Sequence, residues 1–222
     1  VYIPNGSYLI TSTLLLKSGQ ALFGAGSGSI LKAQNTSFHA IHLSEDYITV
    51  ANLKIENGLS GIALYGTTRP CVQNTVRDVW IQHAATGLYL DGYTDPNYPC
   101  YWNYFSNVLV EHPTANGVHL SLSGAGDTPN ANQFHGVRVY SKGTALSGAG
   151  FYIEHGSFNN SLLDCEANVH GSAQGCFIIG AGSNKTLLIN PYAESTNLVP
   201  NIKLEAGSLD TAIYNLLSAS DG

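Results

Sequence analysis

The stretch NTVRDVWIQHAATGLYLDG, residues 74–92, contains the pattern that decides the fold. Its apolar side chains recur at nearly alternate positions, as in a half-buried strand, but the alternation breaks at Asp78, between Val76 and Val79. We therefore expect the chain to bend at Asp78. A second short strand follows the turn at residues 83–87, and two such strands cannot bury an apolar face alone. They need copies of themselves stacked above and below.

The sequence contains these copies. In each copy the bending position is occupied by Asn, Asp or Gly, and the six positions are Asn52, Asp78, Asn107, Gly136, Asp164 and Asn190. They are separated by 26, 29, 29, 28 and 26 positions. These residue types tolerate the left-handed backbone of a sharp corner. Repeats of this length, built from short strands without helical periodicity, predict an all-β parallel solenoid.

An antiparallel sandwich or jelly roll is the main alternative, because it also contains many short strands. Such folds need tight hairpins, and Asn-Gly hairpin signals between adjacent strands are nearly absent. The pairs Asn57-Gly58 and Asn116-Gly117 both fall at the second corner of the repeat. The pattern therefore favours the solenoid.

The amino-acid composition argues against several classes of function. The chain has 222 residues, enough for one elongated domain, with 44% hydrophobic and 11% charged residues and a net charge of −6. The acidic balance and the lack of a Lys/Arg cluster argue against nucleic-acid binding. No apolar run reaches membrane-spanning length, so we expect no membrane insertion. Because the chain opens in mid-strand at Val1 and contains no Met, we expect residues 1–222 to be a single domain of a longer polypeptide.

The segments VYIPNGSYLI, residues 1–10, and LFGAGSGSILKA, residues 22–33, resemble the first rungs of the pectate-lyase-like right-handed parallel β-helix superfamily. Within it, the chain is most similar to bacteriophage tail spikes and appendages that depolymerise polysaccharide. The resemblance implies a parallel homotrimer, a bacterial surface polysaccharide (capsule or O-antigen) as partner, and a place in the virion tail. A secreted bacterial protein is the alternative. Phage members usually carry a capping helix before a VYIP-like strand, which this chain lacks.

The connection after the second strand of the template repeat, residues 91–103, combines tyrosines and a tryptophan with acidic residues. Aromatic rings suit the C–H faces of sugars, whereas carboxylates bond to their hydroxyls. We expect the substrate to contact Tyr89, Tyr93, Trp102 and Tyr152. Alternatively, these rings cover the rung below or a neighbouring subunit.

Aligned second strands place Asp91 and Glu154 two rungs apart, at roughly 10 Å between backbones. Inverting glycosidases hold their two carboxyl groups about 6.5–9.5 Å apart. We therefore predict a glycoside hydrolase in which Glu154 is the general acid, its pKa raised by Tyr152 and Phe177, and Asp91 is the base. His119, on the intervening rung, would orient the substrate.

Other interpretations remain open. Glu56 and Glu111 are also two rungs apart, and any solenoid with scattered acids yields such pairs. A lyase is the second hypothesis, because VWIQHA, residues 79–84, is superficially similar to the WIDH segment of pectate lyases. Gln82 replaces the aspartate of that segment, and a clustered set of calcium-binding aspartates is missing. A non-catalytic module that binds glycan or supports a trimer is the third. No Cys/His spacing resembles a zinc site, so we expect no metal or cofactor.

Four cysteines complete the sequence signals. Cys71 and Cys100 each lie three residues before an asparagine that starts a repeat, so they belong to equivalent points of successive rungs. Stacked strands are roughly 4.8 Å apart, within the Cα separation of about 4.4–6.8 Å that disulfides adopt. We predict that the two are adjacent, as a disulfide or as two thiols. Cys165 and Cys176 are expected in the core, at the positions of Val79 and Leu88.

Overall fold

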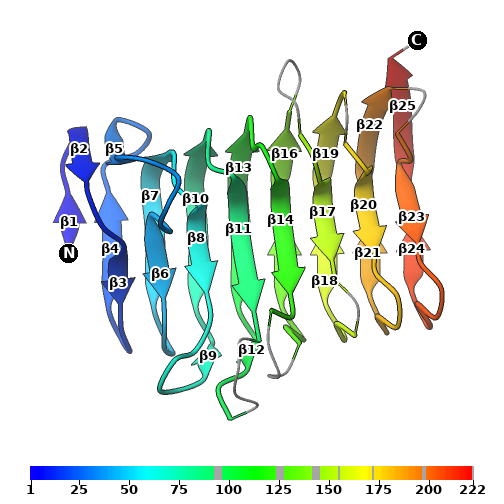
Figure 1. Cartoon of the computed structure of the whole chain (residues 1–222), viewed down its shortest axis with the longest axis horizontal. Coiled ribbons are helices and arrows are strands. Elements are labelled where there is room, and N and C mark those ends of the chain that lie inside the picture. Colours follow the sequence, from blue (N-terminus) through cyan, green and yellow to red (C-terminus); the bar gives the residue numbers. More distant parts are fainter. Residues whose placement is uncertain are drawn as a thin grey trace.

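The computed structural model describes residues 1–92, 97–123, 128–141, 146–154, 156–171, 173–196 and 199–221. Every strand pairing in this part of the chain is parallel, and the strands stack into a right-handed parallel β-helix, as predicted. Figure 1 shows the rungs side by side along the long axis, with the termini at opposite ends of the stack. No helix that could cross a membrane occurs among the described residues.

Sheet A is the larger of the two main sheets, and successive turns of the β-helix contribute its strands. Its described strands are β1 (Tyr2–Ile3), β2 (Gly6–Ile10), β4 (Ala21–Gly24), β5 (Ser29–Ala33), β7 (Thr49–Glu56), β10 (Thr75–Gln82), β13 (Tyr104–Glu111), β15 (Gln133–His135), β16 (Arg138–Tyr140), β18 (Ser161–Leu163), β19 (Glu166–Val169), β21 (Leu187–Ile189), β22 (Tyr192–Thr196), β24 (Ala212–Tyr214) and β25 (Leu217–Asp221).

Sheet B forms the opposite layer, and its arrows run against those of sheet A in Figure 1. Its described strands are β3 (Leu14–Leu16), β6 (Ile41–Leu43), β8 (Ser60–Leu64), β11 (Thr86–Asp91), β14 (Asn116–Ser121), β17 (Ala149–Ile153), β20 (Gly175–Ile179) and β23 (Ile202–Leu204). A short third sheet joins β9 (Cys71–Val72) to β12 (Cys100–Tyr101).

The predicted corners are confirmed. The backbone is left-handed at every predicted corner residue, with φ between 48° and 60° at Asn52, Asp78, Asn107, Gly136, Asp164 and Asn190. In β10 the ladder pairs Arg77 and Val79 with the neighbouring rung and skips Asp78. The corner therefore divides each turn of sheet A into two arms, while the apolar side chains of both arms stay inside.

A ladder of buried asparagines runs through the core at the start of successive sheet A strands. Its members are Asn74, Asn103, Asn132 and Asn160. The Oδ1 atom of Asn103 accepts hydrogen bonds from the backbone nitrogen and from Nδ2 of Asn74, both at 3.0 Å. The Nδ2 atom of Asn103 donates in turn to Oδ1 of Asn132, also at 3.0 Å. Each asparagine thus ties its rung to the next inside an otherwise apolar core.

One register prediction in sheet B is wrong. Tyr152 pairs with Ile178, so Phe177 points inward and stacks on Phe151 at 4.9 Å between ring centroids. Cys176 is buried as expected, but Phe177, not Cys176, lies at the level of Leu88. A slip of one residue moves a strand's side chains to the opposite face.

The error of one residue in the predicted register has a steric origin. The position before the first large core residue of these strands faces inward against sheet A, and four successive rungs have glycine there: Gly61, Gly87, Gly117 and Gly150. In the next rung the small residue at this position is Cys176. Aligning the glycine of GCFIIG with these glycines therefore shifts the strand by one.

Two glycines of neighbouring rungs provide a matched test of these backbone requirements. A Cβ atom on Gly117 would lie 2.4 Å from Val139, whereas a Cβ atom on Gly136 meets nothing within 4 Å, although φ there is +60°. We expect Gly136→Ala to cost about 1–2 kcal/mol from left-handed strain alone. Overpacking should make Gly117→Ala cost about 3 kcal/mol or more. Thermal unfolding of both variants measures the difference, and equal losses would contradict this account of the interior.

Cys71 and Cys100 are register partners in the short third sheet, which confirms that they are adjacent. Both are buried and present as thiols, as are Cys165 and Cys176. Burial raises the pKa of Cys71, and its Cys100 neighbour raises it further. Because the thiolate is the reactive form, we expect the native protein to alkylate at least 100-fold more slowly than the unfolded protein. Quantitative iodoacetamide labelling followed by mass spectrometry tests this, and rapid native labelling of Cys71 would contradict it.

Candidate functional site

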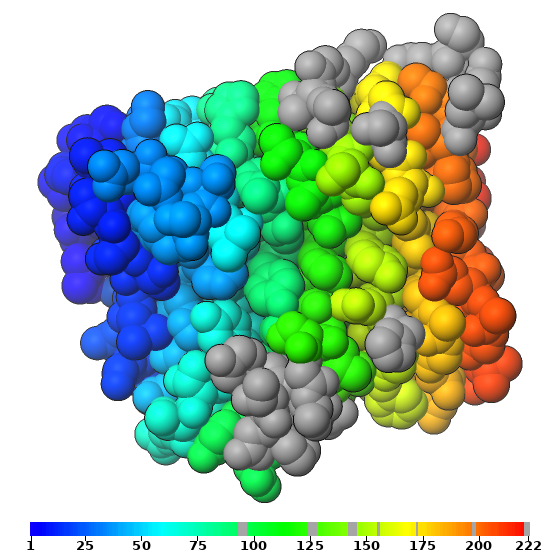
Figure 2. Space-filling view, viewed as in Figure 1, coloured from blue at the N-terminus to red at the C-terminus, as the bar shows by residue number. Residues whose placement is uncertain are grey.

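The outer face of sheet B carries a strip of rings. Alternate residues of each strand point outward, and one register row contains His42, Ala63, Tyr89, His119, Tyr152 and Ile178. His119 stacks on Tyr152 with ring centroids 5.1 Å apart, and the edge of Tyr89 meets His119 at 5.6 Å. Figure 2 shows the side chains of successive rungs packed against one another across one face. Because the strands are parallel and in register, residues from separate repeats lie side by side on one surface.

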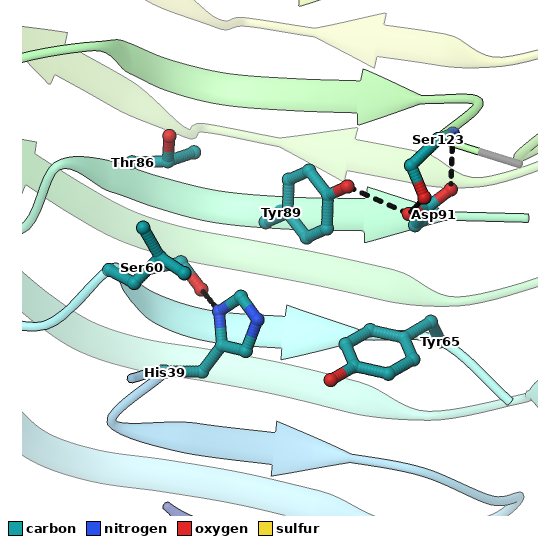
Figure 3. A pocket seen from close by; sticks show the side chains of 8 residues that line it. His39, Ser60, Tyr65, Thr86, Tyr89, Asp91 and Ser123 are labelled. Atoms are coloured by element: carbon teal, nitrogen blue, oxygen red, sulfur yellow. Dashed lines mark hydrogen bonds between the residues drawn. The ribbon is translucent and has the colours of Figure 1, made fainter. Parts of the chain in front are cut away.

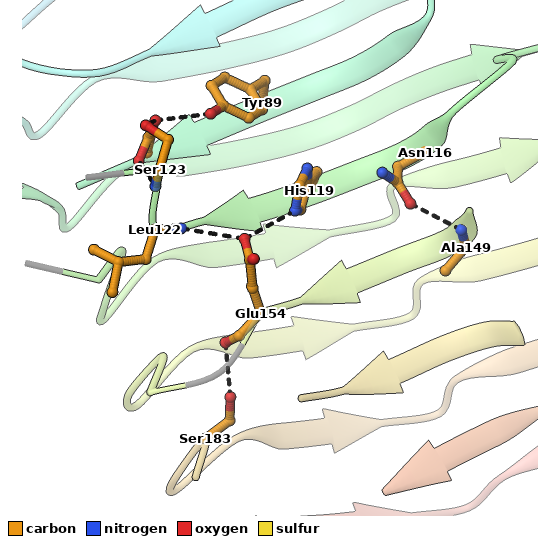
Figure 4. Close-up of polar contacts among 9 residues, drawn as sticks. Tyr89, Asn116, His119, Leu122, Ser123, Ala149, Glu154 and Ser183 are labelled. Carbon is orange, nitrogen blue, oxygen red and sulfur yellow. Dashed lines mark hydrogen bonds and ion pairs between the residues drawn. The ribbon is translucent and has the colours of Figure 1, made fainter. Parts of the chain in front are cut away.

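Glu154 follows β17 and forms an ion pair with His119 on the neighbouring rung. The Nε2 atom of His119 lies 3.2 Å from Oε2 of Glu154, and the backbone nitrogen of Leu122 donates to the same oxygen at 3.2 Å (Figure 4). The His119 contact is the main reason why the pKa of Glu154 is lowered to about 2, although partial burial opposes this shift. The expected raised pKa is therefore wrong. Tyr152 stacks on His119, and Phe177 is in the core, so neither forms an apolar pocket around the carboxyl group.

Asp91 ends β11 and is only 2% exposed. Its carboxylate accepts hydrogen bonds from the hydroxyl of Tyr89 at 2.7 Å, from the backbone nitrogen of Ser123 at 3.1 Å and from Oγ of Ser123. Burial and the neighbouring Asp91 raise the pKa of Tyr89 to about 12, which keeps its hydroxyl a donor.

The two carboxylates belong to one connected group of side chains. Asp91 pairs with Ser121, which lies level with Glu154, so the predicted separation of two rungs is confirmed and corresponds to about 10 Å between backbones. Between them, Tyr89 contacts both Asp91 and His119. We call Asp91, Tyr89, His119 and Glu154 the sheet B cluster.

Beside the cluster is a hollow of about 330 Å³, whose lining extends from Ser123 back to His39 in the N-terminal rungs. It is lined by His39, Leu59, Ser60, Tyr65, Thr86, Tyr89, Asp91 and Ser123 (Figure 3). Sequence reasoning did not assign His39 or Tyr65 to the site. Tyr65 shares a register row with Asp91, which was a usable signal, whereas His39 precedes β6 in a rung that departs from the repeat pattern.

The remaining predicted residues lie elsewhere. Tyr93 is outside the described residues. Trp102 is 57% exposed at a different corner, after β12, where it lines a separate depression together with Gln133, Asn159 and Lys185. That depression does not include Asp91 or Glu154.

The second acidic pair, Glu56 and Glu111, lies on sheet A. Glu111 accepts a hydrogen bond from Nε1 of Trp80 at 2.9 Å, and Glu56 pairs with the ammonium group of Lys54 at 2.8 Å. These partners favour a structural role for both acids. Within the described residues, no group of three or more His, Cys, Asp or Glu side chains is arranged to hold a metal ion.

Comparison with known proteins places the fold. No family model and no curated sequence matches the chain. Among solved structures, the catalytic domain of a GH87 α-1,3-glucanase in complex with nigerose is 13% identical, with a TM-score of 0.57, and the match covers 100% of this chain and 61% of that domain. An alginate lyase from Paenibacillus is 12% identical, with a TM-score of 0.52 and coverage of 96% and 91%.

The A-module of the mannuronan C-5 epimerase AlgE4 from Azotobacter vinelandii is 13% identical, with a TM-score of 0.50 and coverage of 99% and 79%. The chain thus spans about three fifths of the glucanase domain and most of the other two proteins. Identity this low establishes the fold alone, which is the parallel β-helix. These neighbours are β-helix enzymes that process polysaccharides.

Proposed function

We propose that this chain is a polysaccharide-active β-helix domain that binds and hydrolyses a bacterial surface polysaccharide on the outer face of sheet B. The sheet B cluster is the observation that carries the proposal. It combines two carboxylates on alternate rungs with a histidine and a tyrosine in continuous contact, and the ring of Tyr152 stacks on the histidine. The polysaccharide-processing neighbours support the same substrate class.

The low pKa of Glu154 assigns the roles within the cluster. A carboxyl group with a pKa of about 2 is ionised at neutral pH, so Glu154 does not serve as the proton donor. It instead orients His119: when that ring is protonated, Nε2 donates to Glu154 and Nδ1 carries the second proton. Because Nε2 of His119 faces Glu154, Nδ1 is the atom available to the substrate.

Hydrolysis then proceeds as an inverting displacement. His119 donates its Nδ1 proton to the glycosidic oxygen as the bond from that oxygen to the anomeric carbon breaks. A water molecule attacks the anomeric carbon from the opposite face, and Asp91 takes the proton that this water releases. His119 and Asp91 lie on neighbouring rungs, and Tyr89 between them contacts both.

A lyase is the second candidate, because two of the structural neighbours are named for mannuronan or alginate. Lyase chemistry removes a proton next to a uronate carboxylate, and a neighbouring cation must balance the charge that develops there. Asp91 and Glu154 would instead place two carboxylates close to that group, and the cluster contains neither lysine nor arginine. The charge of the cluster therefore favours hydrolysis over elimination.

The biological setting is proposed on the resemblance of the first rungs to phage appendages. In that setting the domain forms a parallel homotrimer and acts outside the cell from a virion tail, with a secreted bacterial protein as the alternative. Light scattering of the purified chain measures its mass directly. A monomer would remove the support for a trimeric appendage without affecting the cluster.

The decisive experiment incubates the protein with a panel of capsular and O-antigen polysaccharides. New reducing ends and ultraviolet absorbance from unsaturated uronic acid are followed together. Reducing ends without absorbance support hydrolysis, and inversion at the anomeric carbon, detected by NMR, supports the roles given to Asp91 and His119. Both signals together would establish a lyase. Silence of a folded sample across the panel would favour a non-catalytic binding module.

A further inference from the structure

The hollow beside Asp91 is bordered by aromatic side chains. Its rings come from three successive rungs: His39 lies nearly parallel to Tyr89, with centroids 5.9 Å apart, and meets Tyr65 at 5.8 Å with the two planes inclined by 65°. Its volume of about 330 Å³ is at the lower end of the range of roughly 300–1,000 Å³ for ligand pockets. That space fits a single sugar residue flanked by aromatic faces.

The outward row of sheet B explains why the space exists. Ala63 occupies this row between His42 and Tyr89, where a ring would continue the strip. A methyl group in place of a ring leaves room over β8 for neighbouring side chains, and Ala63 itself is fully buried. The rings of His39 and Tyr65, which approach from the two ends of the strand, then become walls (Figure 3).

The lining of the hollow contains polar groups and one acidic side chain. Neither lysine nor arginine contributes to it, and Asp91 is its acidic group. Burial lowers the pKa of His39 and so disfavours its charged form, although Asp91 opposes this shift. The other polar groups are hydroxyls from Ser60, Thr86 and Ser123 and the phenols of the two tyrosines. Hydroxyl groups of a sugar find partners here, whereas a carboxylate or sulfate finds a buried anion and no cation.

We infer that this hollow binds one uncharged sugar residue of the polysaccharide, next to the bond that the sheet B cluster cleaves. The inference rests on the proposed function for the position of that bond. Tyr89 belongs to both sites, because its ring forms a wall of the hollow and its hydroxyl donates to Asp91 at 2.7 Å. A sugar seated against Tyr89 therefore presents its neighbouring linkage to Asp91 and His119.

The experiment compares each acidic polysaccharide of the panel with the same polymer after chemical reduction of its carboxylates to primary alcohols. Oligosaccharides from both forms are titrated into the wild-type protein, and binding is measured by saturation-transfer NMR, which does not need turnover. We expect uncharged members and reduced forms to bind at least tenfold more tightly than the parent acids. An acidic oligosaccharide that binds as well as its reduced form, or failure of every uncharged member to bind, would overturn the inference.

Two variants locate the site. Tyr65→Ala and His39→Ala should each raise the Kd of an uncharged oligosaccharide about tenfold, and Tyr140→Ala, a half-buried tyrosine of sheet A, should leave it unchanged. Equal affinities of all four proteins would place binding elsewhere and overturn the inference. Binding with this pattern but without cleavage would refute the proposed hydrolysis and leave the inference standing. Cleavage with a KM that neither variant changes would overturn the inference and leave the proposed hydrolysis standing.

Discussion

Replacement of His119 by Gln is expected to lower kcat on a cleaved polysaccharide by about 10²–10⁴-fold, the usual contribution of a general acid or base. Glutamine retains the size and a donor group but cannot release a proton to the leaving oxygen. Glu154→Gln should lower kcat less, by about 10–100-fold with KM nearly unchanged, because it removes the carboxylate that orients His119 and leaves the proton donor in place. Initial rates of reducing-end formation measure both effects.

The control for this pair is Glu166→Gln, on β19 of sheet A, which should keep the wild-type rate because it changes a carboxylate away from the cluster. A His119→Gln enzyme that works within threefold of the wild type would eliminate His119 as proton donor.

A stability readout checks the ion pair independently of turnover. The pKa of Glu154 is about 2 in the folded chain, against an ordinary value of 4.5. Since the folded value is the lower one, this group stabilises the fold above about pH 4.5, and the stabilisation is lost as the pH falls toward 2. The melting temperatures of wild type and Glu154→Gln should therefore differ at pH 6 and converge as the pH is lowered toward 3. A constant difference across this range would show that the ion pair does not stabilise the fold.

The sequence predicted the solenoid because its repeats require a special backbone at fixed intervals. A left-handed corner favours Asn, Asp or Gly, as at Asp78 and Asn107, and this preference is visible without coordinates. The register of sheet B was less certain, because a small inward residue is satisfied by Gly150 and by Cys176 alike. When several residue types satisfy the same steric requirement, the sequence alone does not show which position meets it.

The candidate site could be predicted only in part for a related reason. The register that places Asp91 and Glu154 on alternate rungs follows from the repeat, so their relation was accessible. The direction of the pKa shift of Glu154 depends on where the Nε2 atom of His119 and the backbone nitrogen of Leu122 point, which the repeat does not encode. The asparagines of the core were visible as the first residue of each repeat, but their hydrogen bonds appear only when the rungs are stacked.

Asn103→Ala is expected to destabilise the protein by about 4 kcal/mol or more, because each buried polar group left without a partner costs about 1–3 kcal/mol. The substitution removes the acceptor of both Asn74 donors and the Nδ2 donor to the carbonyl of Cys71, at 3.1 Å, and to Asn132. A loss of this size is a large part of the total stability of about 5–15 kcal/mol of a typical domain. Asn103→Leu should not rescue the loss, since an apolar side chain leaves the same groups unpaired.

Two further variants separate the ladder from a general sensitivity of this rung. Asn107→Gly keeps the left-handed corner on the surface of the same rung and should cost less than about 1 kcal/mol, although it loses a bond to Asp78. Thr186 lies level with Asn160 at the end of the ladder, and its buried Oγ1 has no hydrogen-bond partner. Thr186→Asn extends the ladder and should stabilise the protein by about 1 kcal/mol. Chemical denaturation of the four proteins orders these effects; if Asn103→Ala costs no more than Asn107→Gly, the asparagine ladder does not hold the rungs together.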